Sequence, residues 1–162
     1  LLRNKIMNHP RYPYHLLREE MQEFILDKLQ LLIERKLIKG IGENGTEYTV
    51  IAQILDLPKE ILRLIQKFDF TKKNPKLIYI NTGETMISLQ DSILVTFLNL
   101  AGFDILFFVP TGYQSVENYF AEKLMEEHQI GEYKYDMQVP DLNNISTNST
   151  RPSWRRKLFR RG

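Results

Sequence analysis

The residues of this chain best suited to bind or transform a small molecule follow the first of two β-prone runs. Thr82, Gly83 and Glu84 follow the apolar run at 77–80, with only Asn81 between. A glycine lets a ligand approach the backbone closely, and a threonine hydroxyl can hydrogen-bond to it. The Glu84 carboxylate can bind ribose hydroxyls, hold a metal or move a proton, which makes it the candidate catalytic residue. The alternative is an ordinary turn at the exit of a strand.

A second polar group follows the β-prone run at 104–109. Its members are Thr111, Gly112, Tyr113, Gln114 and Ser115. The Tyr113 ring can stack on a base. Ser115 is predicted to open a helix, and backbone N–H groups at a helix start attract anions. Both polar groups are therefore predicted to contact a ligand.

The sequence lacks the motifs that would specify a phosphate or a metal ligand. The glycine fingerprint of Rossmann folds and the P-loop motif are both absent, and the three histidines have no metal-ligand spacing. With no cysteine in the chain, disulfides, thiolate catalysis and Cys-based metal sites are excluded. Asp91 and Glu117 lie in the first turns of two predicted helices, where they satisfy the helix dipole and repel phosphate. This pattern favours a metal or a polyol over a phosphate, without defining a set of metal ligands, and no cofactor is predicted.

Two predicted strands, Leu77–Ile80 and Asp104–Val109, position these groups. Both are apolar without alternation, which is typical of parallel strands buried on both faces. Between them, Ser88 to Asp91 fits a capping box, apolar residues with helical spacing follow, and Gly102 stands where a helix commonly ends. Strand, helix and strand make a parallel βαβ unit with a right-handed crossover. Ligands of such sheets bind beyond the carboxyl ends of the strands, where both polar turns lie.

The pattern continues beyond this unit. Residues 115–128 predict a second helix, and the alternating run Tyr133–Val139 predicts a third strand near an edge. Asp141 follows that strand and is a further ligand-binding candidate, although an aspartate after proline is also common in turns. The predicted fold class is α/β: a Rossmann-like three-layer β-α-β-α-β unit with a short parallel sheet, preceded by a helical segment. Because exposed sheet edges are a liability, we expect strands upstream of residue 1 to complete the sheet; the alternative cover is the helical segment.

Residues 1–70 are predicted to form this helical lead-in. A long amphipathic helix runs from Tyr14 to about Ile38, and its apolar stripe comprises Leu17, Met21, Phe24, Ile25, Leu29, Leu32 and Ile33. The stripe extends over too few heptads for a coiled coil, so packing on the same domain is expected, with a partner-binding surface as the alternative. A short helix at 49–55, with a strand as the alternative because of its β-branched residues, and another helix from Pro58 to about Phe68 follow. The Asn44-Gly45 turn before them is compatible with a small hairpin.

Length and composition set broad limits. A chain of 162 residues with 43% apolar and 26% charged residues suits one soluble globular domain, with or without a small addition. No apolar run is long enough to span a membrane. The chain begins Leu1-Leu2-Arg3 without a methionine or a signal peptide, and we expect it to be a fragment of something longer. The predicted divisions are the lead-in at 1–70, an α/β domain at 71–142 and a disordered basic tail at 143–162.

Charge is distributed unevenly along the chain. Residues 151–162 contain six basic residues and no acidic one, whereas the rest has 16 basic and 20 acidic residues, a net charge of −4. The body is therefore a poor candidate for binding nucleic acid. The tail combines Trp154, Leu158 and Phe159 with cations and is able to contact anionic surfaces; a solvated end is the alternative.

Three segments resemble a known family. They are EILRLIQKFDF at 60–70, SLQDSILVTFLNLAGFDILFFVPTGYQSVE at 88–117 and the polar-to-basic end. They are similar to the bacterial YceG-like family found beside tellurite-resistance (Ter) genes, which is described only as a component of a biosynthetic module. The family's members are longer, so the resemblance implies a C-terminal portion. It also implies a bacterial cytoplasmic protein of a Ter-type stress response that helps to make a nucleoside-like metabolite, and it carries over no catalytic residue.

Two functional hypotheses result. In the first, the α/β domain binds a small polar or nucleotide-like ligand at Thr82–Glu84 and Thr111–Gln114, within a Ter-linked stress-response or biosynthetic module. It requires both turns to lie at the same end of the sheet. In the second, the protein is a non-enzymatic assembly module that docks other proteins of the same operon through its N-terminal helix and basic tail. That hypothesis requires the apolar stripe of the helix to be exposed.

Overall fold

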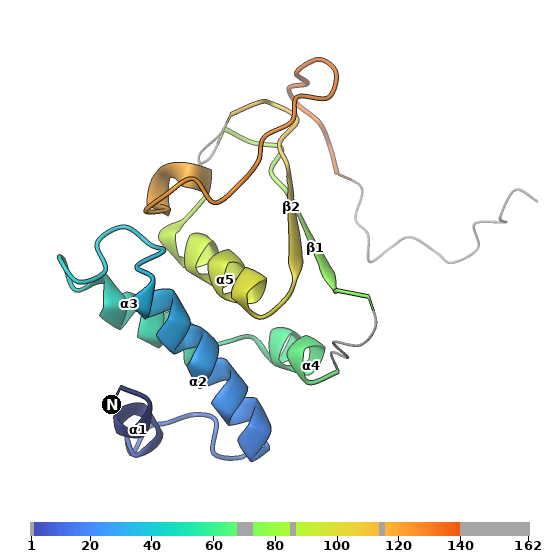
Figure 1. Cartoon of the computed structure of the whole chain (residues 1–162). Coiled ribbons are helices and arrows are strands. Elements are labelled where there is room, and N and C mark those ends of the chain that lie inside the picture. Colours follow the sequence, from blue (N-terminus) through green and yellow to red (C-terminus); the bar gives the residue numbers. More distant parts are fainter. Residues whose placement is uncertain (1, 68–72, 85–86, 114–115, 140–162) are drawn as a thin grey trace, which may run out of the picture.

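The structure is a computed structural model that describes residues 2–67, 73–84, 87–113 and 116–139. The predicted basic tail at 143–162 lies outside these residues. The described elements, in chain order, are α1 (Leu2–Met7), α2 (Glu19–Glu34), α3 (Thr46–Ile54), α4 (Lys59–Lys67), β1 (Lys76–Ile80), α5 (Leu89–Leu100), β2 (Asp104–Phe108) and the 3-10 helix η1 (Val116–Tyr119). Figure 1 shows α5 between the two strands and the pair α2 and α3. This mixture of helices with a small parallel sheet is compatible with the α/β class.

The predicted βαβ unit is confirmed. β1 and β2 pair in parallel, in a register that runs from Lys76 opposite Asp104 to Ile80 opposite Phe108. The predicted cap of α5 is also present, because the Ser88 hydroxyl accepts a hydrogen bond from the Asp91 N–H at 3.0 Å. The second half of the capping box differs: the Ser88 hydroxyl itself donates to Asp91 Oδ2 at 2.7 Å. Gly102, with φ of 97°, ends the helix in the left-handed region as expected.

α5 is the most deeply buried helix among the described residues. Its buried side chains do not form a single stripe; they are Ser92, Ile93, Val95, Thr96, Phe97 and Leu98. A helix that is apolar around most of its circumference must be covered on more than one side. Its two buried hydroxyls are satisfied locally, since Ser92 donates to the Ser88 carbonyl and Thr96 to the Ser92 carbonyl. α5 therefore joins the sheet to the N-terminal helices in a single core cluster.

The N-terminal helix is shorter than predicted from Tyr14 to Ile38, because α2 begins at Glu19 and ends at Glu34. Tyr14 belongs instead to a turn, in which the Leu17 N–H donates to the Tyr14 carbonyl. The apolar stripe nevertheless faces the core: Leu32 is fully buried, and Leu17 and Phe24 pack partly buried against the core cluster. The stripe is therefore an internal packing surface.

The next two predicted helices are present with shifted bounds. α3 occupies Thr46–Ile54 rather than 49–55, and α4 covers Lys59–Lys67, while Phe68 lies outside the described residues. No hairpin forms at Asn44-Gly45. Gly45 instead precedes α3 with φ of 74°, so the glycine serves as a helix N-cap.

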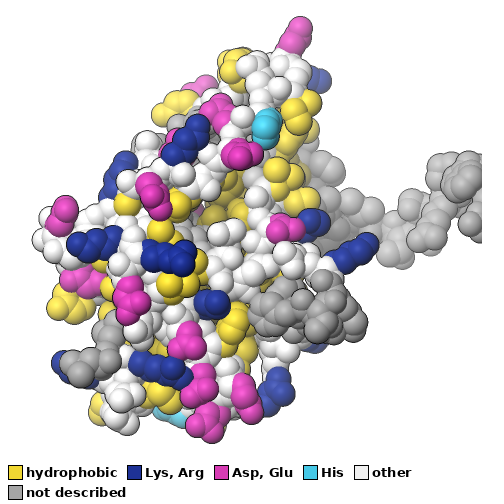
Figure 2. Space-filling view, viewed as in Figure 1, with side chains coloured by type: hydrophobic (Ala, Val, Ile, Leu, Met, Phe, Trp, Pro, Cys, Tyr) yellow, Lys and Arg dark blue, Asp and Glu magenta, His cyan; other side chains and the backbone are white. Residues whose placement is uncertain are grey.

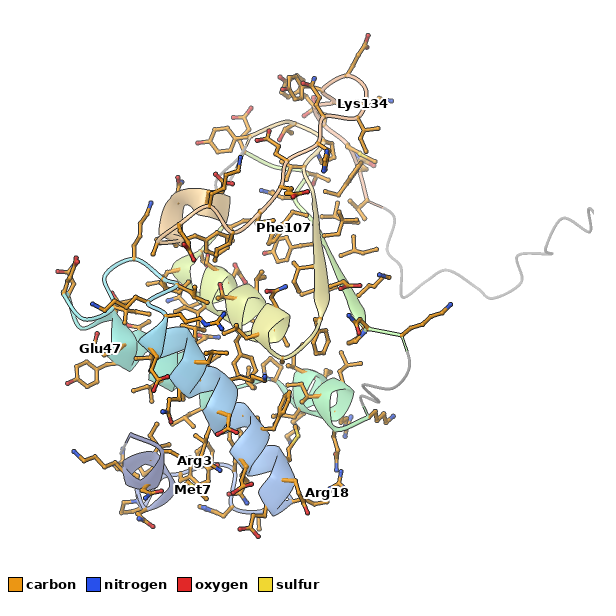
Figure 3. All side chains as sticks on the ribbon, in the orientation of Figure 1. Arg3, Met7, Arg18, Glu47, Phe107 and Lys134 are labelled. Atoms are coloured by element: carbon orange, nitrogen blue, oxygen red, sulfur yellow. The ribbon has the colours of Figure 1, made fainter. Side chains whose placement is uncertain are left out.

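The expectation that both strands are buried on both faces is wrong. Leu77, Tyr79, Ile105 and Phe107 point to one side and pack partly buried against the core cluster. Figure 3 shows Phe107 on the α5 side of β2. Alternate residues point to the other side, where they remain exposed to solvent: Ile78, Ile80, Leu106 and Phe108. The described residues thus cover only one face of the sheet.

The predicted second half of the sheet is also corrected. The helix expected at 115–128 is reduced, among the described residues, to the single 3-10 turn η1, and no helix or strand occurs at 121–139. The third strand predicted at Tyr133–Val139 is thus absent, and the described sheet has two strands. A Rossmann-like three-layer arrangement is not confirmed. Backbone contacts to other elements hold this segment instead: Lys39 N–H donates to the Tyr119 carbonyl, and Ala121 N–H to the Leu37 carbonyl, both at 2.9 Å.

No helix in the described part of the chain combines the length and the apolar character that crossing a membrane requires. On the molecular face seen in Figure 2, acidic and basic side chains are both scattered over the surface, and several acidic ones lie together at its lower edge.

Two neighbouring buried tyrosines differ in their hydrogen bonding. The Tyr14 hydroxyl donates to the Ile54 carbonyl at 2.6 Å and accepts from the Leu57 N–H at 3.0 Å. It therefore satisfies two backbone groups at the end of α3. The Tyr12 hydroxyl is buried and has no hydrogen-bond partner among the described residues. The two rings meet edge to face, with centroids 5.9 Å apart.

We expect Tyr14→Phe to lower the free energy of unfolding by about 1–3 kcal/mol, because it leaves a buried carbonyl and a buried N–H unpaired. Tyr12→Phe is the matched control, because it removes a buried hydroxyl that has no hydrogen-bond partner among the described residues. Its effect on the free energy of unfolding should be near zero or stabilising. Urea unfolding of both variants measures the difference. Equal losses in the two variants would contradict the assigned roles.

Stability should also fall at alkaline pH. Burial raises the pKa of Tyr14 to about 12 from its ordinary value of 10.0. The folded state therefore holds this proton more tightly than the unfolded state, so the resulting stabilisation is complete below pH 10 and is lost as pH rises towards 12. Urea midpoints measured between pH 9 and 12 should decline less steeply in Tyr14→Phe than in the unsubstituted protein. Parallel declines would show that Tyr14 does not contribute.

Candidate functional site

Both predicted ligand-binding turns lie at the same end of the sheet. They follow Ile80 of β1 and Phe108 of β2, which are directly opposite in the parallel register. A further backbone hydrogen bond, from Asn81 N–H to the Phe108 carbonyl at 3.0 Å, joins the strands where they end. Figure 1 shows both exits at the end of the sheet away from α4. The geometric condition that the ligand hypothesis set is therefore met.

A surface hollow of about 380 Å³ lies between these turns. Its lining residues are Glu84, Thr111, Gly112, Tyr113, Tyr133 and Tyr135. The first four belong to the two predicted turns, and the two further tyrosines come from the segment that follows η1. The volume is in the range of small-molecule sites. The three tyrosines are each about half exposed, so the hollow is open rather than enclosed.

The turn after β2 is held by short-range hydrogen bonds. Thr111 is buried, and its hydroxyl accepts from the Tyr113 N–H at 3.3 Å. Gly112 N–H donates to the Val109 carbonyl at 3.0 Å, and φ of Gly112 is +68°. This left-handed conformation favours glycine. These contacts orient Tyr113 at the edge of the hollow.

Tyr133 lies directly over Gly112. A Cβ atom placed on Gly112 would come within 2.2 to 2.9 Å of three Tyr133 ring carbons, which is too close for any side chain. One backbone hydrogen bond fixes this segment to the strand exit, from Lys134 N–H to the Pro110 carbonyl at 2.8 Å. Figure 3 shows Lys134 beyond the ends of the strands. Gly112 thus provides both the turn and the space that the Tyr133 ring occupies.

The other predicted site residues are placed differently. Thr82 and Gly83 are partly buried beside Glu84 but do not line the hollow. The Gly83 N–H donates to Asn81 Oδ1 at 3.2 Å, which makes their turn an Asx turn. The remaining candidates lie outside the described residues: Gln114, Ser115 and Asp141.

The electrostatics of the hollow favour neutral or cationic ligands. Among the described residues, Glu84 is the one charged residue of its lining, which includes no described lysine, arginine or histidine. The start of α5 does not offer a free anion site, because Asp91 occupies it and hydrogen-bonds to Ser88. Burial raises the pKa of Tyr79, and the Asp91 carboxylate, which hydrogen-bonds to that tyrosine, raises it further. Asp91 is therefore engaged inside the fold and would repel a phosphate.

The described lining residues of the hollow supply groups that can bind a ligand. Within the described ranges, no three His, Cys, Asp or Glu side chains come together in a way that could hold a metal ion. Glu84 can accept hydrogen bonds from hydroxyl or amine groups, and the tyrosines supply ring faces and hydroxyls. Glu84 and the tyrosine hydroxyls are the titratable groups among the described lining residues, and a general acid or base would have to come from these.

The sequence did not point to Tyr133 and Tyr135 as site residues. Their alternation with charged residues predicted an edge strand instead, and the contact with Gly112 spans about twenty residues of chain. The glycine at position 112 is a local signal, because glycine permits a left-handed turn and a close approach of another group to the backbone. Nothing in the sequence pattern says which residue makes that approach.

Comparisons with known proteins agree on one family. The profile of the YceG domain matches residues 1–150. A curated relative, the uncharacterised protein YceG of Bacillus subtilis (strain 168), is 25% identical over 145 residues, which are 86% of this chain. The chain spans only 27% of that relative's length. No solved structure matches.

We expect Gly112→Ala to distort the hollow, because the new methyl group collides with the Tyr133 ring in addition to straining the turn. The loss of stability should exceed the cost of about 1–2 kcal/mol for a left-handed alanine. Gly131→Ala is the matched control, since Gly131 has φ of +80° but nothing within 4 Å of its added Cβ. Urea unfolding gives the two losses, and NMR shifts of the Tyr133 ring report its displacement. Equal losses with an unmoved Tyr133 ring would contradict the packing described.

Proposed function

Because the chain belongs to the YceG domain family, we propose that it acts in a bacterial stress-response or biosynthetic module of the kind encoded beside tellurite-resistance genes. In this proposal it works in the cytoplasm and binds a small polar or nucleotide-like ligand at the carboxyl ends of β1 and β2. One observation carries the ligand part: residues from both strand exits line the same hollow. The role in a Ter-type module rests on the family resemblance.

The composition of the hollow supports a sugar-like or nucleoside-like ligand. Sugars and bases have flat or ring-shaped surfaces that stack on tyrosine rings, and three tyrosines line this hollow. A carboxylate is a suitable acceptor for paired hydroxyl groups, which is the role proposed for Glu84. A free phosphate group finds no cationic partner among the described lining residues. Any phosphate of a nucleotide-like ligand would therefore point away from Glu84, towards solvent.

The alternative function, an assembly module that docks operon partners, loses one of its two supports. It required an exposed apolar stripe on the N-terminal helix, but α2 buries Met21, Ile25 and Leu32 in the core. The basic tail that it also invoked lies outside the described residues. Ligand binding is therefore the function that the geometry favours.

Two substitutions test the ligand proposal. Tyr113→Ala should weaken ligand binding about 10- to 100-fold, because base or sugar stacking on an aromatic ring contributes about 1–3 kcal/mol. Glu84→Gln should weaken it about tenfold or more, since a hydrogen bond to a charged group contributes about 1.5–3 kcal/mol. The ligand is first identified by native mass spectrometry of the protein purified from bacterial cells, and its affinity is then measured by calorimetry.

Tyr48→Ala is the matched control, because Tyr48 is an exposed tyrosine on α3 and does not line the hollow. It should leave binding unchanged. Failure to recover any ligand, or equal effects of Tyr48→Ala and Tyr113→Ala, would reject this site.

A further inference from the structure

One face of the sheet presents apolar side chains to solvent. We call it the open face and define it by Ile78 and Ile80 of β1 and by Leu106 and Phe108 of β2, which are between 40% and 58% exposed. In the parallel register Ile78 lies opposite Leu106, and Ile80 lies opposite Phe108, so the four side chains form a contiguous block. At the start of the same face, Lys76 and Asp104 form a salt bridge of 2.7 Å. The apolar block is therefore bounded by a polar pair at one end.

An open face of this kind is unusual for parallel strands, whose two faces are normally both covered. Exposed apolar side chains that occur singly need no explanation, but a contiguous block marks a surface that binds something. The occupant must present apolar groups of its own, because four large hydrophobic side chains offer no hydrogen bonds.

The chain itself contains a segment with this chemistry. Residues 154–161, with the sequence WRRKLFRR, combine Trp154, Leu158 and Phe159 with five basic residues. We propose that this segment docks on the open face of its own chain, with its apolar side chains against Leu106 and Phe108. The surface is thus assigned to an intramolecular contact, separate from the ligand hollow of the proposed function.

Charge at the carboxyl end of the sheet complements this segment. The segment that borders the strand exits carries Glu132 and Asp136, both exposed, against Lys134, and Glu84 lies in the adjoining turn. Without residues 151–162 the chain has a net charge of −4. The basic residues that flank the apolar groups of the tail would therefore meet an acidic rim, and docking should weaken as salt screens these charges.

Chain length permits the contact. Fourteen residues separate Val139 from Trp154, and an extended chain of that length spans roughly 45 Å. The open face itself is five residues long, roughly 17 Å. A tethered segment also acts at a high effective concentration, roughly millimolar, so a small apolar block suffices.

Four partly exposed side chains fall well below the roughly 800 Å² per partner that a stable dimer needs, which argues against a second copy as the occupant.

Trp154 provides the probe, since it is the single tryptophan of the chain. In the 162-residue chain, diluted until sedimentation shows a monomer, its fluorescence should lie at shorter wavelength and be less quenched by acrylamide than in a peptide of residues 151–162. Leu106→Ser should lower the docking equilibrium constant roughly tenfold, with a matching loss of protection from acrylamide. Leu16→Ser is the matched control, because Leu16 is 95% exposed and lies outside the sheet.

A tail variant, the double substitution Leu158→Ser and Phe159→Ser, keeps the test valid if Leu106→Ser does not fold. It should release Trp154 in the same way while circular dichroism stays unchanged. Two results would overturn the proposal: a Trp154 that is as exposed in the monomer as in the peptide, or protection that appears only at concentrations where the protein dimerises. The proposal is supported if Trp154 is protected from acrylamide in the unsubstituted chain and in Leu16→Ser. This protection must be lost in both Leu106→Ser and the tail variant.

Discussion

The burial of α5 on more than one side is the constraint on which the rest of this structure depends. A helix with Ile93, Phe97 and Leu98 buried together with Val95 and Thr96 cannot lie on a surface. The sheet covers part of it, and α2 with α3 covers another part (Figure 1). α5 contacts α2, α3 and β2, so it packs against both layers. The same helix also fixes the connection between β1 and β2, and with it the end of the sheet where the two turns meet.

The features that the sequence predicted correctly are those whose cause is local. The Ser88 cap, the Gly102 stop and the parallel pairing around a helix-length crossover each follow from a few neighbouring residues. The burial of the α2 stripe also followed from its spacing. The bounds of α2 were less accurate because Tyr14 is drawn into a turn by its bonds to Ile54 and Leu57, about forty residues away.

The failed predictions concern segments whose structure is set by distant contacts. Alternation at Tyr133–Val139 is a valid strand signal, yet a strand also needs an edge to pair with. This segment instead forms a hydrogen bond to Pro110 and places Tyr133 over Gly112. The unbroken apolar runs of β1 and β2 likewise predicted burial on both faces, although the described residues supply a cover for one. For the hollow, the sequence pointed to the turns that contain Glu84 and Thr111–Tyr113, whose role in ligand binding stays a prediction, and it missed the two tyrosines for the same non-local reason.

The way the hollow is built has consequences for how it can bind. One wall is a tight turn, with Thr111 buried and Gly112 held by a backbone hydrogen bond. Tyr133 and Tyr135 contribute another part of the lining from a segment without regular structure, joined to the strand exit by the Lys134 hydrogen bond. A wall held by few contacts costs free energy to order when a ligand binds, which lowers affinity for a given contact area. Specificity would then come mainly from the turns of the βαβ unit, with Glu84 selecting against anions, and the tyrosines would supply stacking area that tolerates different rings.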